Sequence, residues 1–491
     1  MERLAFGYGT SKASAEPAVA GSRPAGRGVM DTPPSPLPAP AAVVERGEER
    51  DWAFVGLMLF TGLLFLRPQD VFTPLRALHL AELAALFALG SLVFGRLGRG
   101  LPVTRMTPEL AGVFAFALLI LMTAPFAVWM GGAVRTFTDL YVKVVLIFVL
   151  MVNTLTTPKR VEQFTWLLVL ASGYIGGRAA LDYLRGIHLV ENGRVMGSVG
   201  GMFKNPNDLA LNMVAILPLA AYLAMRPLPA MRRLVAAGCA LLMLFAIVGS
   251  QSRSGTVGLG AMVLVFGACM MQRKPGLVFA MALAGVLALP MLPASYRERL
   301  ASITNKDLDQ TGSREARSIL LHESFDAFLA NPLTGVGAGQ FKNYNPDERQ
   351  EAWRESHNVV LQVAAELGIF GVLVFAFLVA RGMYAPLQTR RLLRLSGGGG
   401  VSARGSRDVP AAPLPAGEQE MLALHSVALS AAVAGWFVCA LFASVAYHWT
   451  FYYLLALAVM PRDYLQARLS AGREARRSAA ARTVVAAGAR I

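Results

Sequence analysis

Residues 108–129, PELAGVFAFALLILMTAPFAVW, contain a single charged side chain, Glu109. A helix of about 20 apolar residues crosses the hydrocarbon core of a bilayer. Within lipid, backbone N–H and C=O groups must be hydrogen-bonded inside the segment, and a helix does this. Runs of this kind recur along the 491-residue chain. They predict an all-α, polytopic integral membrane protein with about 12 transmembrane helices and a large periplasmic loop.

Three parts of the chain differ in composition. Residues 1–50 are rich in Ala, Pro, Gly and Arg, which predicts a disordered cytoplasmic segment. Residues 51–461 contain the apolar runs and form the predicted membrane domain, and residues 462–491 form a basic cytoplasmic tail. The predicted spans are 52–66, 77–95, 108–129, 137–153, 163–182, 208–225, 234–249, 255–271, 276–293, 358–380, 421–443 and 447–461.

The charge distribution orients these spans. The chain is 55% hydrophobic and only 16% charged, which excludes a soluble protein of this length. Its net charge of +15 does not indicate nucleic-acid binding, because the basic residues lie in loops after every second span. Lys and Arg mark the cytoplasmic side of membrane proteins. The loop at 294–357 is therefore predicted to be periplasmic, and the linker at 381–420 cytoplasmic.

Neither a metal site nor a cofactor site is predicted. All three cysteines lie in apolar runs, without the spacing of metal ligands or of a disulfide framework. Asp139 and Lys143 stand four residues apart in a span and are expected to pair. Glu82 and Glu366 stand without a partner in apolar runs, which makes them secondary candidates for a functional role.

Four polar residues on the predicted external side are the main candidates: Arg194, Arg253, Arg317 and His357. Guanidinium groups donate forked hydrogen bonds that match phosphate oxygens, so several facing one cavity suit a diphosphate. A nearby histidine can take a proton from an attacking hydroxyl. Their positions in the sequence are equally compatible with other roles. Arg194 or Arg253 would then contact lipid headgroups, Arg317 would be a solvated charge, and His357 would cap a helix. The glycine-rich GVGAGQF is weak support for phosphate binding.

Four sequence motifs, in a fixed order along the chain, resemble those of a known protein family. Arg194 precedes GGMFKNPNDLA (200–210), and SQSRSG (250–255) follows. Arg317 precedes NPLTGVGAGQF (331–341), and HNVVLQVAAELGIFG (357–371) comes last. Together they resemble the O-antigen ligase and O-antigen polymerase superfamily of bacterial membrane glycosyltransferases. The family usually has Trp four residues after the loop arginine, where this chain has Leu321. Arg314 therefore competes with Arg317 for that assignment.

The resemblance implies a reaction and roles for residues. Such enzymes transfer a glycan from an undecaprenyl-diphosphate carrier to a hydroxyl acceptor, without metal and with inversion, on the periplasmic face of the bacterial inner membrane. By resemblance, Arg194, Arg253 and Arg317 bind the diphosphate, and His357 is the catalytic residue on the acceptor side. Site-shaping roles are expected for Asn207, Asn358 and, as the alternative to Arg317, Arg314.

The acceptor separates the activities within the family. We expect a ligase that uses a lipid A-core glycolipid, and a repeat-unit polymerase is the first alternative. A transferase to Ser or Thr of a protein is also compatible with the motifs. From a different class, a flippase or transporter of lipid-linked glycan suits the number of spans. It is disfavoured because paired helices broken by Gly or Pro are missing from the two halves of the sequence.

Overall fold

The computed structural model describes residues 51–190, 193–198, 200, 203–302, 313–347, 349–351, 353–397 and 414–488. The segment 1–50, predicted to be disordered, lies outside these residues. Helices make up 80% of the described chain, and strands are almost absent from it, so the all-α prediction is confirmed. One short antiparallel hairpin pairs β1 (Leu189–Val190) with β2 (Arg194–Val195).

The helices follow the predicted order. They are α1 (Trp52–Leu66), α2 (Pro68–Val71), η1 (Thr73–Leu78), α3 (Leu80–Leu97), α4 (Pro108–Thr123), η2 (Ala124–Phe126), α5 (Met130–Thr136), η3 (Phe137–Tyr141), α6 (Val142–Thr154), α7 (Pro158–Arg185), α8 (Pro206–Met225), α9 (Ala230–Ser250), α10 (Arg253–Met271), α11 (Pro275–Ala288), η6 (Leu289–Met291), α12 (Ala294–Ala301), α13 (Ser313–Ala330), η8 (Phe341–Asn343), α14 (Val359–Gly397), α15 (Ala416–Ala440) and α16 (Trp449–Gly488). The label α14 covers two helices that meet at a kink at Gly368.

Ten helical runs in the described part of the chain are long and apolar enough to cross a membrane. The pair Pro275–Met291 and Ala294–Ala301, bent by 108°, gives up to eleven. Every predicted span has a helix at its place, and the chain is a multi-pass membrane protein. The helix at the twelfth predicted span, α16, is not among the apolar runs, because Arg462 and Asp463 interrupt its apolar sequence.

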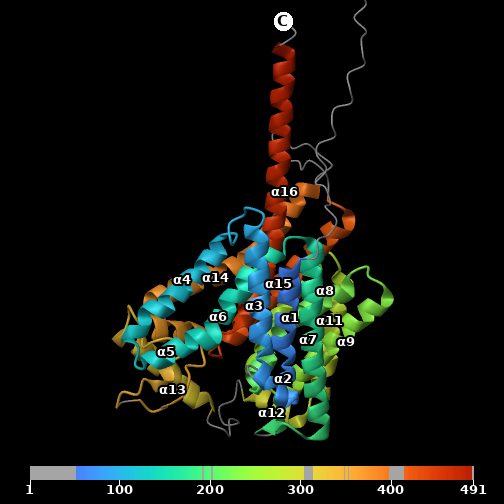
Figure 1. Ribbon diagram of the computed structural model, residues 1–491. Helices are drawn as coiled ribbons and strands as arrows, with labels where there is room; N and C mark the ends of the chain where they lie inside the picture. The colour runs from blue at the N-terminus through green and yellow to red at the C-terminus, as the bar shows by residue number, and fades with distance from the viewer. Residues whose placement is uncertain are drawn as a thin grey trace, which may run out of the picture. The chain divides into compact units, whose positions relative to one another are not determined.

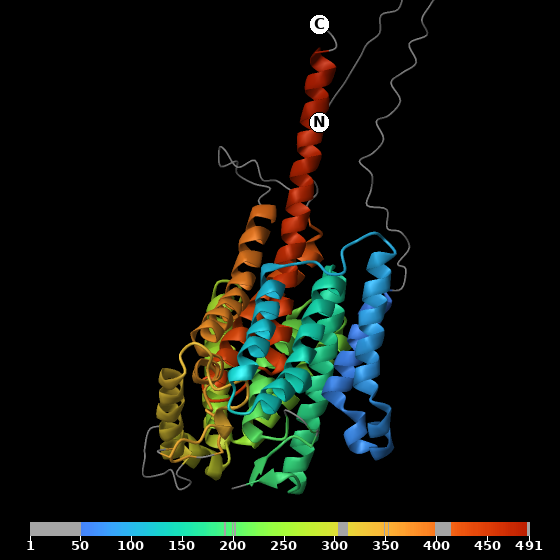
Figure 2. The same ribbon diagram turned by 60° about the vertical axis from the view of Figure 1, so that its left-hand side comes forward.

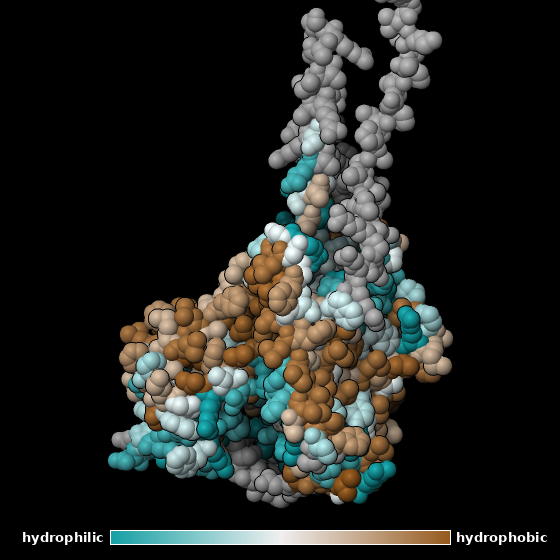
Figure 3. Space-filling view, viewed as in Figure 1, coloured by the Kyte–Doolittle hydropathy of each residue, from teal (hydrophilic) through white to brown (hydrophobic). Residues whose placement is uncertain are grey.

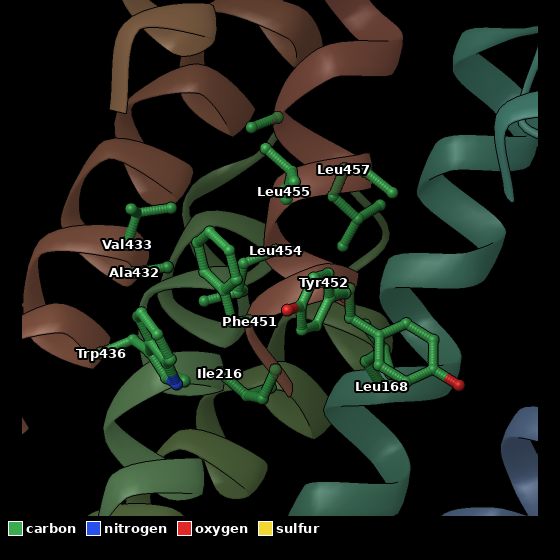
Figure 4. Close-up of a cluster of buried hydrophobic side chains, with 14 of the residues drawn as sticks. Leu168, Ile216, Ala432, Val433, Trp436, Phe451, Tyr452, Leu454, Leu455 and Leu457 are labelled. Carbon is green, nitrogen blue, oxygen red and sulfur yellow. The ribbon is translucent and has the colours of Figure 1, made fainter. Parts of the chain in front are cut away.

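The first turns of α16 form the centre of the bundle instead of a lipid-facing surface. Residues 451–459 are all buried, and the Phe451 ring stacks on Trp436 of α15 with centroids 4.5 Å apart. Figure 4 shows this cluster, with Leu168 of α7 and Ile216 of α8 completing it. A helix that is apolar all round is enclosed by other helices. The start of α16 therefore packs against protein on every side.

The two ends of the bundle differ. Figures 1 and 2 place α12 and α13 at its lower end, while the C-terminal half of α16 projects from the upper end. The space-filling view shows apolar residues over the middle of the bundle and polar residues over much of the lower end (Figure 3). The long segment that contains α12 and α13 thus lies at one end of the apolar band, as an alternation of spans requires.

The predicted pairing of Asp139 with Lys143 is wrong. A π-helical turn, Phe137–Tyr141, separates α5 from α6. A π-turn adds a residue to the helical register, so positions four apart no longer lie above one another. The Asp139 carboxylate instead accepts a hydrogen bond from Thr138 Oγ1 at 3.1 Å.

A buried ion cluster at the other end of the bundle was missed from the sequence. Glu109 of α4 is fully buried and accepts from Arg462 Nη1 of α16 at 2.8 Å. Arg381 of α14 donates to the same carboxylate through Nε at 2.6 Å. A buried charge must be paired to be tolerated. These contacts join three helices that are far apart in sequence, so local patterning does not reveal them.

Candidate functional site

Side chains from five separate segments line one cavity of about 500 Å³. It contains two of the three predicted arginines, Arg253 and Arg317, together with His357 and Asn358. The rest of its lining is made of small hydroxyl groups and apolar side chains. These are Ser254, Val257, Ser302, Ser318, Leu321, Ser356, Leu441 and Phe442. The sequence thus identified the basic and acid–base groups, but not the apolar wall between them.

Arg253 stands at the first position of α10. The preceding Ser252 caps this helix, because its Oγ accepts from Gly255 N at 3.2 Å. The Arg253 guanidinium donates to Ser302 Oγ at 3.0 Å, and Ser302 Oγ donates to the Arg299 carbonyl at 2.7 Å. A helix N-terminus carries a partial positive charge. The helix start and the guanidinium therefore make this wall of the cavity electropositive.

Arg194 does not line the cavity but lies behind this wall. Its Nε donates to the Ser250 carbonyl at 3.0 Å, and its Nη2 donates to Asn207 Oδ1 at 2.8 Å. The same Asn207 oxygen accepts from Ser252 Oγ at 2.8 Å. Arg194 and Asn207 thus hold the turn that presents Arg253. These contacts support a positioning role for both residues.

His357 is held in a backbone conformation that L-residues rarely adopt. Its φ is +50°, and its N–H donates to Ser444 Oγ at 3.0 Å. Such strain persists only where the surroundings impose it, and it often marks functional sites. Within the described residues, no hydrogen bond reaches the imidazole. His357 also lines the cavity.

Asn358, not His357, caps the following helix. Its Oδ1 accepts from Val360 N at 2.9 Å and Leu361 N at 3.0 Å, while its Nδ2 donates to the Leu441 carbonyl at 3.1 Å. Asn358 thus ties the start of α14 to the segment after α15. Its site-shaping role stays a prediction. Asn358 therefore fills the helix-capping role that was the alternative explanation for His357.

Burial is the main cause of a lowered pKa at His357, with the positive charges of Arg317 and Arg354 adding to it. The pKa falls from 6.5 to about 4. The imidazole is consequently neutral at pH 7, with a lone pair available to accept a proton. An anion bound at Arg317 would offset part of the positive charge and make the imidazole more basic.

Arg317 and Leu321 face the cavity from the same side of α13, one turn apart. Leu321 occupies the position where the resembling family usually has Trp, so an apolar contact is kept at this wall with a smaller side chain. The competing Arg314 stands in the first turn of α13, and its side chain lies outside the described residues. The choice between the two arginines stays a prediction.

The glycine-rich phrase does not form a phosphate loop; it docks against the kink of α14. Val336 N donates to the Ala365 carbonyl at 2.8 Å, and Gly337 N donates to the Glu366 carbonyl at 3.0 Å. Gly339 N donates to Glu366 Oε2 at 2.9 Å. These N–H groups are occupied and cannot cradle a phosphate. Glu366, expected to be unpartnered, is the acceptor that joins the two motifs.

We expect Gly335→Ala to destabilise this docking by about 2–5 kcal/mol. Gly335 has φ +63°, and a Cβ there would meet the Glu366 carbonyl carbon at 2.3 Å. Thermal unfolding of the purified protein measures the effect. The matched control is Gly285→Ala on α11, where an added Cβ meets nothing within 4 Å. Equal melting temperatures for the two variants would contradict the docking role.

Two further expectations concern charges and metal. Glu82 is exposed on α3 with His79 Nδ1 3.9 Å away, and it does not line the described cavity. No group of three or more His, Cys, Asp or Glu side chains among the described residues is arranged to hold a metal ion. Metal independence stays a prediction.

The fold and the cavity define a polytopic membrane protein with an electropositive, partly apolar site at one end of its bundle. Residues 238–376 match the family described as O-antigen ligase. This part of the chain is therefore similar to the O-antigen ligase and polymerase superfamily, as the motifs predicted. The matched segment includes Arg253, Arg317 and His357, but not Arg194. Neither a curated protein nor a solved structure matches the chain.

This family suggests glycosyltransferase activity, with glycan and lipid-linked substrates in a membrane environment. The match does not distinguish the donor, the acceptor or the stereochemistry of the reaction.

Proposed function

We propose that the protein transfers a glycan from an undecaprenyl-diphosphate carrier to a hydroxyl acceptor, as an O-antigen ligase does. The observation that carries the proposal is the cavity, in which two guanidinium groups and a neutral imidazole face a shared space beside an apolar wall. Guanidinium groups suit the diphosphate, the imidazole suits the hydroxyl, and the apolar wall suits the first isoprene units.

The proposed reaction is a single displacement at the anomeric carbon of the glycan. His357 takes the proton of the acceptor hydroxyl as its oxygen bonds to that carbon. The bond from the carbon to the diphosphate oxygen breaks, and undecaprenyl diphosphate leaves with the electron pair. Arg253 and Arg317 stabilise the negative charge that develops on the leaving group. Attack opposite the leaving group inverts the configuration, and no metal ion is needed to neutralise the diphosphate.

The membrane side is also part of the proposal. The basic loops alternate with the cavity-bearing segments along the chain, which supports a cavity on the periplasmic face of the inner membrane. Lipid-linked glycans and glycolipid acceptors would meet there at the surface of the outer leaflet. The basic tail at 462–491 and the linker at 381–420 would then be cytoplasmic, with segment 1–50 on the same side.

A second, apolar cavity of about 260 Å³ begins close to the site. Val360, two residues after Asn358, stands at its start, and Phe437 of α15 lies four residues before Leu441. On α14 it extends from Val372 to Met383, roughly 17 Å at 1.5 Å per residue. That length approximates one leaflet of a bilayer core of about 30 Å. We therefore assign part of the donor's polyprenyl tail to this cavity.

Ala376→Trp should fill this cavity and lower transfer from a full-length polyprenyl donor by about tenfold or more. Ala376 is exposed on α14 and lines the cavity. Transfer from a water-soluble donor with a short prenyl chain should change less than twofold, because its tail does not reach Ala376. Ala284→Trp, on the exposed surface of α11, is the control. An equal loss with both donors would rule out a tail site.

A transfer assay with purified protein tests the function itself. Labelled lipid-linked glycan is mixed with a lipid A-core acceptor in detergent, with EDTA present. We expect labelled glycolipid and free undecaprenyl diphosphate in equal amounts. Transfer to a second lipid-linked repeat unit instead would identify the polymerase alternative, and transfer to Ser or Thr would identify a protein acceptor. An absence of any acceptor-dependent carrier release would leave a flippase or transporter.

A further inference from the structure

Arg349 is an almost fully buried arginine in the loop between α13 and α14, with a side chain 2% exposed. Its guanidinium lies 4.2 Å from the centre of the Phe341 ring and donates to the Phe341 carbonyl at 2.5 Å. It also donates to the carbonyls of Tyr344 and, at 2.8 Å, Arg354. One side chain thus gathers both arms of this loop. Arginine suits the role because its planar fork donates in several directions at once.

Glu323 of α13 completes the arrangement from the other side. Its Oε2 accepts from Arg349 Nε at 3.1 Å. Its Oε1 accepts from the backbone of Gln350 at 2.6 Å and of Glu351 at 3.0 Å. The carboxylate therefore holds both the guanidinium and the backbone that follows it. These are charge-assisted hydrogen bonds, about twice as strong as neutral ones.

The two residues join the elements that carry opposite sides of the cavity. Arg317 stands six residues before Glu323 on the same helix. His357 follows Arg354, whose carbonyl Arg349 holds, by three residues. Neither Arg349 nor Glu323 lines the cavity. Their effect on a reaction there would pass through the residues they place.

We propose that Arg349 and Glu323 form a latch that fixes His357 relative to Arg317, and so fixes the acceptor side of the site relative to the diphosphate side. The latch contains both residues of the pair and the five backbone groups that they hold: the carbonyls of Phe341, Tyr344 and Arg354 and the amides of Gln350 and Glu351. The role of the latch in catalysis rests on the function proposed above. The strained backbone at His357 needs such an outside constraint, because a φ of +50° is not kept by local preference.

A latch that positions His357 and a contact needed only for folding predict different effects on kcat. Misplacement of a catalytic group by about 1 Å lowers a rate by up to 10²-fold, while ground-state binding of the donor is little affected. Loosening the latch should therefore reduce kcat and leave donor binding unchanged. A contact needed only for folding would lower the amount of folded protein and leave kcat per folded molecule unchanged.

The test uses Glu323→Gln and Arg349→Lys in the full-length protein, with Asp326→Asn as control. Asp326 is an exposed carboxylate one turn further along α13. Glutamine cannot accept all of the hydrogen bonds made by the carboxylate, and lysine cannot reach all of the carbonyls held by the fork. Hydrogen exchange of the peptide covering 349–358, kcat, and the Kd for undecaprenyl diphosphate are measured on each protein.

We expect both latch variants to exchange about tenfold faster across 349–358, with kcat lowered about 10–100-fold and the Kd changed less than twofold. Exchange equal to that of Asp326→Asn overturns the latch. Faster exchange with kcat unchanged, or with the Kd weakened as much as kcat, overturns its positioning role. If no protein transfers glycan, the proposed function fails, while the exchange measurement still decides whether the latch holds the His357 segment.

Discussion

Replacing His357 with alanine is expected to lower glycan transfer by about 10²–10⁴-fold, the contribution of a general base. Burial and two neighbouring arginines lower the pKa of this imidazole to about 4, so it is neutral at pH 7. The unprotonated ring is the form that accepts the proton of an acceptor hydroxyl. Transfer measured per folded protein, with donor and acceptor saturating, gives the effect directly.

The pH dependence gives an independent signature of the same residue. Acidification protonates the imidazole, so the rate should fall as pH decreases. Because the pKa is lowered to about 4, the free protein should keep its rate well below pH 6.5. His322→Ala is the control, since His322 is exposed on α13 and does not line the cavity. Near wild-type transfer by His357→Ala at normal abundance would remove this residue from the chemistry.

Arg253→Lys is expected to lower kcat by about 10²-fold, although it conserves the charge. The leaving diphosphate gains negative charge in the transition state, and interactions formed mainly in that state accelerate the reaction. Arg253 stands at the N-terminus of α10, where its guanidinium is oriented by Ser302. Lysine keeps a point charge but loses the fork that matches two phosphate oxygens.

Arg185→Lys provides the matched control for that substitution. Arg185 is an exposed arginine in the last turn of α7, away from the cavity lining. Both variants should reach the membrane in equal amounts, and only Arg253→Lys should lose transfer. If Arg253 merely contacted lipid headgroups, the two substitutions would have equally small effects on transfer per molecule.

The membrane fold could be predicted because a bilayer imposes one requirement on every span: enough apolar length with all backbone groups hydrogen-bonded. That requirement is local, so each predicted span has a helix at its place. The environment of the first turns of α16 could not be predicted from local sequence. Its apolar stretch is enclosed by other helices, and Arg462, which follows that stretch in the sequence, is paired with Glu109 from a distant helix. Burial by protein and burial by lipid leave the same apolar signature in a sequence.

Residues of the candidate site could be predicted where a short sequence motif contains the reactive side chain. Arg253, Arg317 and His357 line one cavity, as their common side suggested. Arg194 was grouped with them because the residue type and the predicted side of the membrane do not reveal where a side chain points. In the structure, the Arg194 guanidinium donates hydrogen bonds to the Ser250 carbonyl and to Asn207 Oδ1. The glycines of GVGAGQF were ambiguous for a similar reason. A glycine that lets backbone approach a phosphate and one that lets it approach another helix look the same.

The latch was not visible in the sequence at all. Arg349 and Glu323 lie 26 residues apart in a segment of mixed charge, where no spacing rule links them. Their pairing depends on how the loop returns across α13, and only the tertiary structure determines that path. The same holds for Glu366, whose partner Gly339 N comes from a different motif. Long-range contacts of this kind set the geometry of the cavity.

Photo-cross-linking with the donor tests most directly whether this cavity is the site of transfer. A lipid-linked glycan with a photoreactive group on its first isoprene unit is bound to the purified protein, irradiated, and mapped by mass spectrometry. We expect labelling within 253–257, 317–321 and 441–442, suppressed by excess unmodified donor and weakened in Arg253→Lys. Suppressible labelling at the opposite end of the bundle, around 226–233, with none at the cavity, would contradict it.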